Sequence, residues 1–208
     1  MDSVSSRSRS PSVDGNGNGN AEKQKEEGEK EEKQETKLSL SEFRAYNRLA
    51  EHMEQFHNHF RLAWNELYGA CTDNKEEELD WLSTRRLIQR GLDFCSQLGI
   101  HHAIEEEYLF PELARRMPDF RPGCSLLLDQ HGEIHAGMDR LEAYLRRCMR
   151  GKIGREGDDE ELRLEEVKRL MDGFGEVLWR HLDEEVRALR AENMRRYWSL
   201  EEVRRLPI

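Results

Sequence analysis

The sequence lacks several features that would each point to a particular class of protein. It has no CxxC pair, because its cysteines lie far apart, at Cys71, Cys95, Cys124 and Cys148. That spacing argues against a zinc knuckle and against the dense disulfide framework of small secreted domains. No apolar run approaches the roughly 18 to 20 residues that span a bilayer, and the N-terminus has no apolar signal-peptide core. We therefore expect no membrane association and a reducing compartment, the cytoplasm or also the nucleus.

An excess of positive charge is also missing. The chain has 33 Lys and Arg against 43 Asp and Glu, a formal net charge of −10. A broad basic surface for nucleic acid is therefore not expected. At 208 residues the chain is long enough for one ordinary domain with a core and too short for two large ones.

The first 37 residues have almost nothing to bury. They consist largely of Ser, Gly, Asn, Glu and Lys, from "SVSSRSRSPS" to "EEKQETK", and such segments do not form a packed core. We expect residues 1–37 to be a disordered polar tail through which a protein partner could bind. Residues 38–195 should form the folded domain, and residues 196–208 a short C-terminal helical extension.

From residue 38 onward, apolar residues recur at intervals of three and four, which is typical of amphipathic helices, and no segment alternates like a strand. The four long segments with this period cover roughly residues 41–70, 83–117, 125–150 and 160–191. "MPDFRPG" and "GKIGREGDD" separate the last three, and "SLEE" resembles a capping box that opens a short helix. The pattern predicts an all-α fold, an antiparallel up-down four-helix bundle.

All eight histidines lie within these four segments, and five of them follow the apolar stripes. Side chains three or four residues apart share one face of a helix, so a residue in step with the stripe points to the core. Two glutamates are also in step, each four residues after a histidine. The inward-facing set is His57, His101, Glu105, His131, His135, His181 and Glu185.

Burying five imidazoles and two carboxylates without a partner would cost several kcal/mol in desolvation. A metal ion compensates directly, since imidazole nitrogen and carboxylate oxygen are metal ligands and the ion neutralises the carboxylates. The sequence therefore predicts a metal site within the bundle. His52, His59 and His102 are expected at the surface or outside the ligand set, although His102 with Glu106 is a competing register, because Ile88, Cys95 and His102 also fall at helical spacing.

Nitrogen and oxygen ligands without thiolate suit iron or manganese and are compatible with zinc. Seven ligands are too many for one ion. If two six-coordinate ions share two bridging carboxylates and a bridging oxygen, about eleven of twelve positions are filled, which leaves one for a small ligand such as dioxygen, nitric oxide or peroxide.

Four motifs together resemble the hemerythrin-like family, also called the HHE cation-binding domain. They are "HNHFR", "HHAIEEEYLFP", "DQHGEIH" and "HLDEEVRAL", spread over about residues 45 to 190. Within the family's HxxxEExxLFP motif, "LFP" at Leu109 to Pro111 selects His101 with Glu105. The resemblance implies two non-haem iron ions per chain with an oxo or hydroxo bridge. His57, His101, His131, His135 and His181 would be the nitrogen ligands, and Glu105 and Glu185 the bridging carboxylates.

The chain departs from the oxygen-carrying hemerythrins, which have an Asp five residues after the last histidine where this chain has Glu185 four residues after His181. The resemblance therefore implies a protein that binds or senses dioxygen, a related small ligand or iron itself, more than a carrier. Two alternatives stay open. One is a di-iron oxidoreductase acting on an unknown substrate, for which the sequence offers no catalytic residue beyond the ligands. The other is a metal-free helical interaction module.

Overall fold

The computed structural model describes residues 37–72, 80–123, 125–151 and 161–206. Within these ranges the chain is all-helical and contains no strand, as the sequence predicts. The tail predicted for residues 1–37 falls outside the described residues except for Lys37, and so does most of the "GKIGREGDD" link. No described helix is long and apolar enough to cross a membrane.

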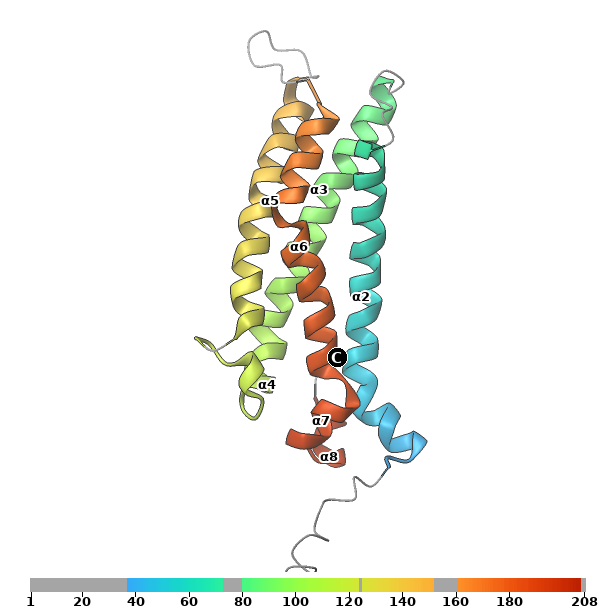
Figure 1. The fold of residues 1–208 in the computed structure, drawn as a ribbon, viewed down its shortest axis with the longest axis vertical. Coiled ribbons are helices and arrows are strands. Elements are labelled where there is room, and N and C mark those ends of the chain that lie inside the picture. Colours follow the sequence, from blue (N-terminus) through green and yellow to red (C-terminus); the bar gives the residue numbers. More distant parts are fainter. Residues whose placement is uncertain (1–36, 73–79, 124, 152–160, 207–208) are drawn as a thin grey trace, which may run out of the picture. The chain divides into compact units, whose positions relative to one another are not determined.

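Four long helices lie side by side within the unit Ser39–Ile208 (Figure 1). Each contacts two of the others, α2 with α3, α3 with α5, α5 with α6 and α6 with α2, so that the contacts close into a ring. The inner faces of the four helices therefore pack against one another. The four are α2 (Leu40–Thr72), α3 (Trp81–Ile104), α5 (Leu126–Gly151) and α6 (Leu164–Leu189).

Apolar periodicity explains which helix faces are buried. In α6 the whole expected stripe is buried, from Leu164 through Met171 to Leu178. In α2 the spacing of the apolar residues predicts Phe56 on the buried stripe with Met53 and Phe60, but this prediction is wrong, because its side chain is 46% exposed. Four residues beyond the buried Met53 the helix reaches His57 instead, and Phe60 follows three residues later on the same face.

The second predicted helix is interrupted by a π-helical turn, which the sequence reading did not anticipate. Between α3 and α4 (Phe110–Ala114) lies η2 (Glu105–Leu109), in which the Phe110 N–H donates to the Glu105 carbonyl five residues back. Pro111 has no N–H to continue the α-helical ladder, which favours such a wide turn. The spacing of apolar residues in this segment predicts Leu109 on the buried stripe, but the extra residue shifts the buried position to Phe110. Helix α4 then ends at Ala114.

The chain turns sharply between α4 and α5, as "MPDFRPG" predicts. A short 3₁₀ helix, η3 (Pro118–Phe120), follows α4, and Gly123 then adopts a positive φ of 77°. A residue with a side chain is strained at that angle, whereas glycine is not.

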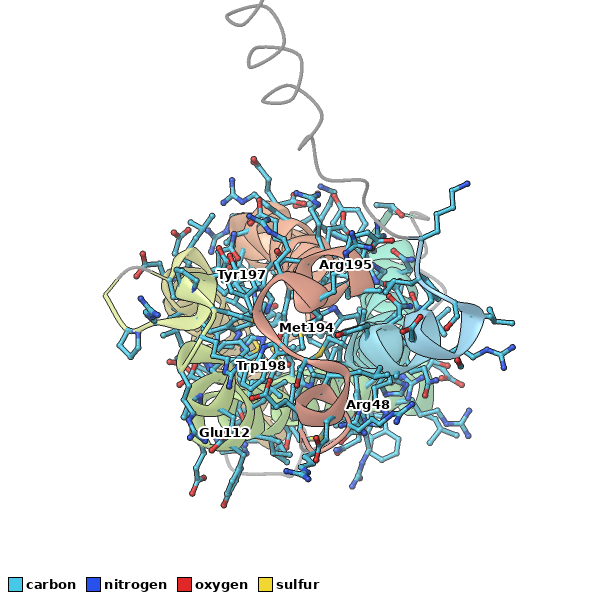
Figure 2. The ribbon with its side chains drawn as sticks, turned by 90° about the horizontal axis from the view of Figure 1, so that it is seen from below. Arg48, Glu112, Met194, Arg195, Tyr197 and Trp198 are labelled. Carbon is cyan, nitrogen blue, oxygen red and sulfur yellow. The ribbon has the colours of Figure 1, made fainter. Side chains whose placement is uncertain are left out.

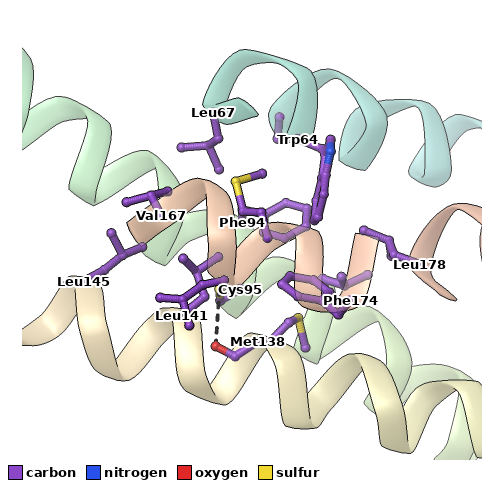
Figure 3. Packing of buried hydrophobic residues seen from close by; sticks show 14 of the residues in the cluster. Trp64, Leu67, Phe94, Cys95, Met138, Leu141, Leu145, Val167, Phe174 and Leu178 are labelled. Carbon is purple, nitrogen blue, oxygen red and sulfur yellow. Dashed lines mark hydrogen bonds between the residues drawn. The ribbon is translucent and has the colours of Figure 1, made fainter. Parts of the chain in front are cut away.

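A large apolar cluster fills part of the interior, with contributions from all four long helices (Figure 3). Trp64 packs edge-on against Phe94 and Phe174, with ring centroids 5.9 and 5.2 Å away. Cys95 lies in the same cluster, where burial raises the pKa of its thiol to about 12. Cys124 lies outside the described residues.

Two short helices, α7 (Ala191–Tyr197) and α8 (Leu200–Val203), pack against α2 at one end of the long helices. Figure 2 looks onto this end. The predicted capping box is present, since the Glu202 N–H donates to Ser199 Oγ and the Ser199 N–H to the Glu202 carboxylate. The Tyr46 hydroxyl donates to the Trp198 carbonyl at 3.2 Å. The C-terminal segment thus closes off the end of the interior that lies beyond His57.

Candidate metal centre

The polar part of the interior adjoins the apolar cluster on the same inward faces, since Phe60, Leu98 and Ile134 of the cluster lie three residues from His57, His101 and His131. All eight histidines are in the long helices, as predicted. Six acidic and imidazole side chains of the predicted set, together with His102, gather here from α2, α3, η2, α5 and α6. They form two groups that could each hold a metal ion: His102, Glu105, His131 and His181, and His57, His101, Glu105 and Glu185.

Within each group, one nitrogen or oxygen atom per residue lies within 4.8 Å of the corresponding atoms of the others. Glu105 belongs to both groups, because its two oxygens diverge. Its Oε1 is 2.8 Å from His101 Nε2, and its Oε2 is 3.5 Å from His131 Nε2. The π-helical turn begins at this residue, so the least regular turn of the helix carries the carboxylate that the two groups share.

Glu185 also reaches histidines of both groups. Its Oε2 lies 3.2 Å from His57 Nε2 and 3.7 Å from His181 Nε2. On the side of the first group, the Nε2 atoms of His131 and His181 are 3.2 Å apart. The interior therefore places two carboxylates between two sets of imidazole nitrogens.

Three of the histidines are oriented by a partner on the outer ring nitrogen. The Nδ1–H of His57 donates to the Leu182 carbonyl at 2.9 Å, and that of His131 to Glu106 Oε1 at 2.7 Å. The Nδ1–H of His181 donates to Gln130 Oε1 at 3.2 Å. With Nδ1 protonated, each neutral ring keeps the Nε2 lone pair for the interior, which is the arrangement of metal-ligating histidines.

Gln130 is itself held in place. Its Nε2 donates to Glu184 Oε2 at 2.6 Å, and its side chain is buried between α5 and α6. Gln130 and Glu184 are residues of the site that the sequence did not suggest, while Glu106, named there only in the alternative register with His102, orients His131. Gln130 immediately precedes the "HGEIH" motif and Glu106 follows Glu105, but their partners lie on other helices, so the periodicity of one helix cannot reveal them.

Seven inward-facing atoms lack hydrogen-bond partners among the described residues. These atoms are the Nε2 nitrogens of His57, His101 and His102 and all four carboxylate oxygens of Glu105 and Glu185. A buried polar atom without a partner costs about 1–3 kcal/mol. Since the unsatisfied atoms are nitrogen lone pairs and carboxylate oxygens, a cation supplies the missing partner to all of them. The residues present therefore fit a metal ion.

Burial also sets the protonation of the imidazoles. It lowers the pKa of His101 to about 4 and that of His181 to about 3, although the Glu185 carboxylate opposes the shift in both. Burial lowers the pKa of His131 and His102 as well. At neutral pH these rings are uncharged, which is the form that binds a metal.

The two carboxyl groups respond in opposite directions. Burial, reinforced by the nearby Glu185, raises the pKa of Glu105 well above its usual range. For Glu185, burial is outweighed by the neighbouring imidazoles of His57, His181 and His101, which lower its pKa. Two carboxylates this close and this buried repel each other, and a cation between them relieves that repulsion.

The remaining histidines differ in their placement. His52 is half-buried against Phe56, and the exposed His59 hydrogen-bonds Gln97 at 2.9 Å between Nε2 and Oε1. His135, from the predicted set, belongs to neither group and is half-buried. His102, expected outside the ligand set, is fully buried and stacks on His131 with ring centroids 3.9 Å apart.

Both registers considered for "HHAIEEE" contribute to the site. Glu105 is buried between the two groups, while the side chain of Glu106 is 44% exposed and orients His131. His101 and His102 both point inward. The spacing of Ile88, Cys95 and His102, all buried, was the signal for His102 in the sequence.

Comparison with known proteins agrees with this site. A family model, the Hemerythrin HHE cation binding domain, matches residues 30–189 and so covers all the candidate ligands. No curated protein and no solved structure matched the chain. The buried histidines and glutamates could bind a metal, and the chain belongs to the hemerythrin HHE cation-binding family.

Proposed function

We propose that this protein is a non-haem di-iron protein that binds or senses dioxygen, a related small ligand such as nitric oxide or peroxide, or iron itself. The observation that carries the proposal is the position of Glu105 and Glu185, each of which reaches histidines of both groups. Two carboxylates shared between two sets of imidazoles suit a pair of ions better than a single one.

The long helices would hold the two ions as an antiparallel up-down four-helix bundle, which their ring of contacts supports. His57, His101, Glu105, His131, His181 and Glu185 would be ligands, and His135 was the seventh predicted one. Iron suits the donor set because imidazole and carboxylate are its ligands and no thiolate is among them. When bound, iron would supply the one-electron chemistry and the open coordination position that a small diatomic ligand requires.

The protein would contribute orientation and a dry interior. Gln130, Glu106 and the Leu182 carbonyl fix the rings of three histidines, and burial keeps the imidazoles neutral. The apolar cluster beside the site excludes water from one side of it. A site of this kind binds a small ligand without needing a general acid or base of its own.

The test is the iron content per chain after anaerobic loading, read beside the ultraviolet-visible spectrum with and without azide. His101→Ala and His181→Ala should each lose iron and lower the melting temperature, because each removes an inward nitrogen. His59→Ala is the matched control, since His59 is exposed on α2 and contacts Gln97. Full iron and an unchanged melting temperature in both site variants would contradict the proposal and favour a metal-free helical module.

A further inference from the structure

Three histidines of the site follow one rule. In His57, His131 and His181 the Nδ1–H donates to an outer partner, and Nε2 faces the interior. The partners are a carbonyl, a carboxylate and an amide oxygen, all of which can only accept from an imidazole N–H. The direction of each hydrogen bond is therefore fixed, and with it the nitrogen that is left for a metal.

His102 follows the same rule. Its ring is fully buried against those of His131 and His181, with centroids 3.9 and 5.3 Å away. Its Nε2 is buried and has no hydrogen-bond partner among the residues that the structure describes, and it shares a group with Glu105, His131 and His181. Its Nδ1 is hydrogen-bonded at 3.3 Å to Nε2 of His135. The outer partner of His102 is thus another imidazole.

His135 breaks the rule. The nitrogen that it directs toward the site is engaged by His102, and its side chain is half-buried while the members of the two groups are buried. If the Nδ1–H of His102 donates, the lone pair of His135 Nε2 is occupied by that hydrogen bond. If His135 Nε2 carries the proton, that nitrogen has no lone pair to give. In neither tautomer can His135 Nε2 bind an ion while this contact is kept.

We infer that His102 is a metal ligand of this centre through Nε2, and that His135 is a positioning residue that holds the His102 ring. The inference rests on the proposed function and changes one member of the ligand set implied by the family resemblance. The first group then contains His102, His131, His181 and Glu105, and each of its imidazoles has a distinct outer partner: His135, Glu106 or Gln130.

The experiment compares iron stoichiometry and the rate of iron loss to excess chelator in His102→Leu, His135→Ala and the control His59→Ala. His102→Leu should lose one iron per chain relative to wild type, because it removes a donor. His135→Ala should keep the full stoichiometry but release iron about 10 to 100 times faster, as expected when an outer partner is removed. His135→Gln should restore slow release, because its amide oxygen can accept the Nδ1–H of His102.

A second readout separates ligation from packing. Pulsed electron paramagnetic resonance or X-ray absorption gives the number of imidazoles on iron, which should fall in His102→Leu and stay unchanged in His135→Ala. Because His102 is fully buried, circular dichroism of the metal-free variants checks that they fold. If His102→Leu does not fold, His102→Met keeps more of the side-chain volume and takes its place.

Each outcome has a distinct meaning. Loss of an iron in His135→Ala, whether alone or together with loss in His102→Leu, would overturn the inference, because His135 would then be a ligand. Wild-type stoichiometry and imidazole number in His102→Leu would overturn it as well. A wild-type chain that takes up no iron would overturn both this inference and the proposed function, so the two failures are told apart by the wild type alone.

Discussion

The same four helices build two interiors that differ in what they need. Around Trp64, Phe94, Leu141 and Phe174 the interior is apolar and close-packed, and no buried nitrogen or oxygen atom of its described side chains lacks a hydrogen-bond partner. A few turns along, at Glu105 and its neighbours, the same inward faces carry imidazoles and carboxylates, and seven of their inner atoms have no hydrogen-bond partner in the part of the chain that the structure describes. Helical periodicity alone decides that both sets are buried, whereas their chemistry decides whether burial stabilises the fold.

The comparison implies that the two regions contribute to stability in different ways. Apolar burial stabilises a protein by about 25 cal/mol per Å², while unpartnered polar groups lower its stability. We infer that the apolar region holds the long helices together without metal and thereby keeps the ligands assembled for an ion to enter. The free energy of metal binding can then add to the stability of an already folded chain.

The largest expected effect comes from breaking the apolar region. Leu141 is fully buried in the cluster and Leu62 is 70% exposed on α2. Leu141→Ala should lower the free energy of unfolding by about 2–5 kcal/mol, measured by urea denaturation, whereas Leu62→Ala should stay within about 0.5 kcal/mol of wild type. Iron content should not change, because Leu141 lies ten residues, roughly 15 Å along the helix, from His131. Equal losses in the two variants would mean that the cluster does not hold the helices together.

Metal acts on the other region. At a free iron concentration of about one hundred times the dissociation constant, binding should stabilise the fold by about 2.7 kcal/mol. Chelation should remove this increment from wild type and from Leu141→Ala alike, since distant sites add independently. Thermal melting with and without chelator measures it. Unfolding of the chelated wild-type chain would show instead that the apolar region cannot hold the helices alone.

A smaller effect tests how closely α5 and α6 approach each other. A Cβ on Gly137 would lie 2.4 Å from the Phe174 side chain, whereas a Cβ on Gly173 would meet nothing within 4 Å. Gly137→Ala should cost about 1–3 kcal/mol through overpacking, and Gly173→Ala should stabilise by up to about 1 kcal/mol through helix propensity. Chemical denaturation of both variants gives the difference, and a stabilised Gly137→Ala would contradict the close approach.

Much of the fold follows from helical periodicity. So do six of the seven predicted ligands, which are the ones that lie in the two groups. Leu178, His181 and Glu185 are in step on α6, and all three are buried. His102 was underestimated for a geometric reason. Successive residues of an α-helix are 100° apart, and a helix that packs between two neighbours buries an arc at least that wide, so His101 and His102 can both face inward. A single stripe of residues has room for only one of them.

Other features need contacts that one helix cannot show. The bond from His131 to Glu106 and the chain from His181 through Gln130 to Glu184 depend on how two or three helices are set against each other. Side-chain periodicity reports which face is buried but not the height at which neighbouring helices meet. The π-helical turn could have been suspected from Pro111, although a proline also permits a kink or a helix end.

That turn makes the spacing of the "HHAIEEEYLFP" segment intolerant of deletion. Removal of one residue between Glu106 and Leu109 would allow an unbroken α-helix, and every side chain on one side of the turn would rotate by about 100° relative to the other side. Either the imidazoles of His101 and His102 or the apolar side chains of Phe110 and Leu113 would then leave the interior. The motif therefore joins two helical segments whose inward-facing positions are offset by one residue. Its length is as much a part of the site as its residues.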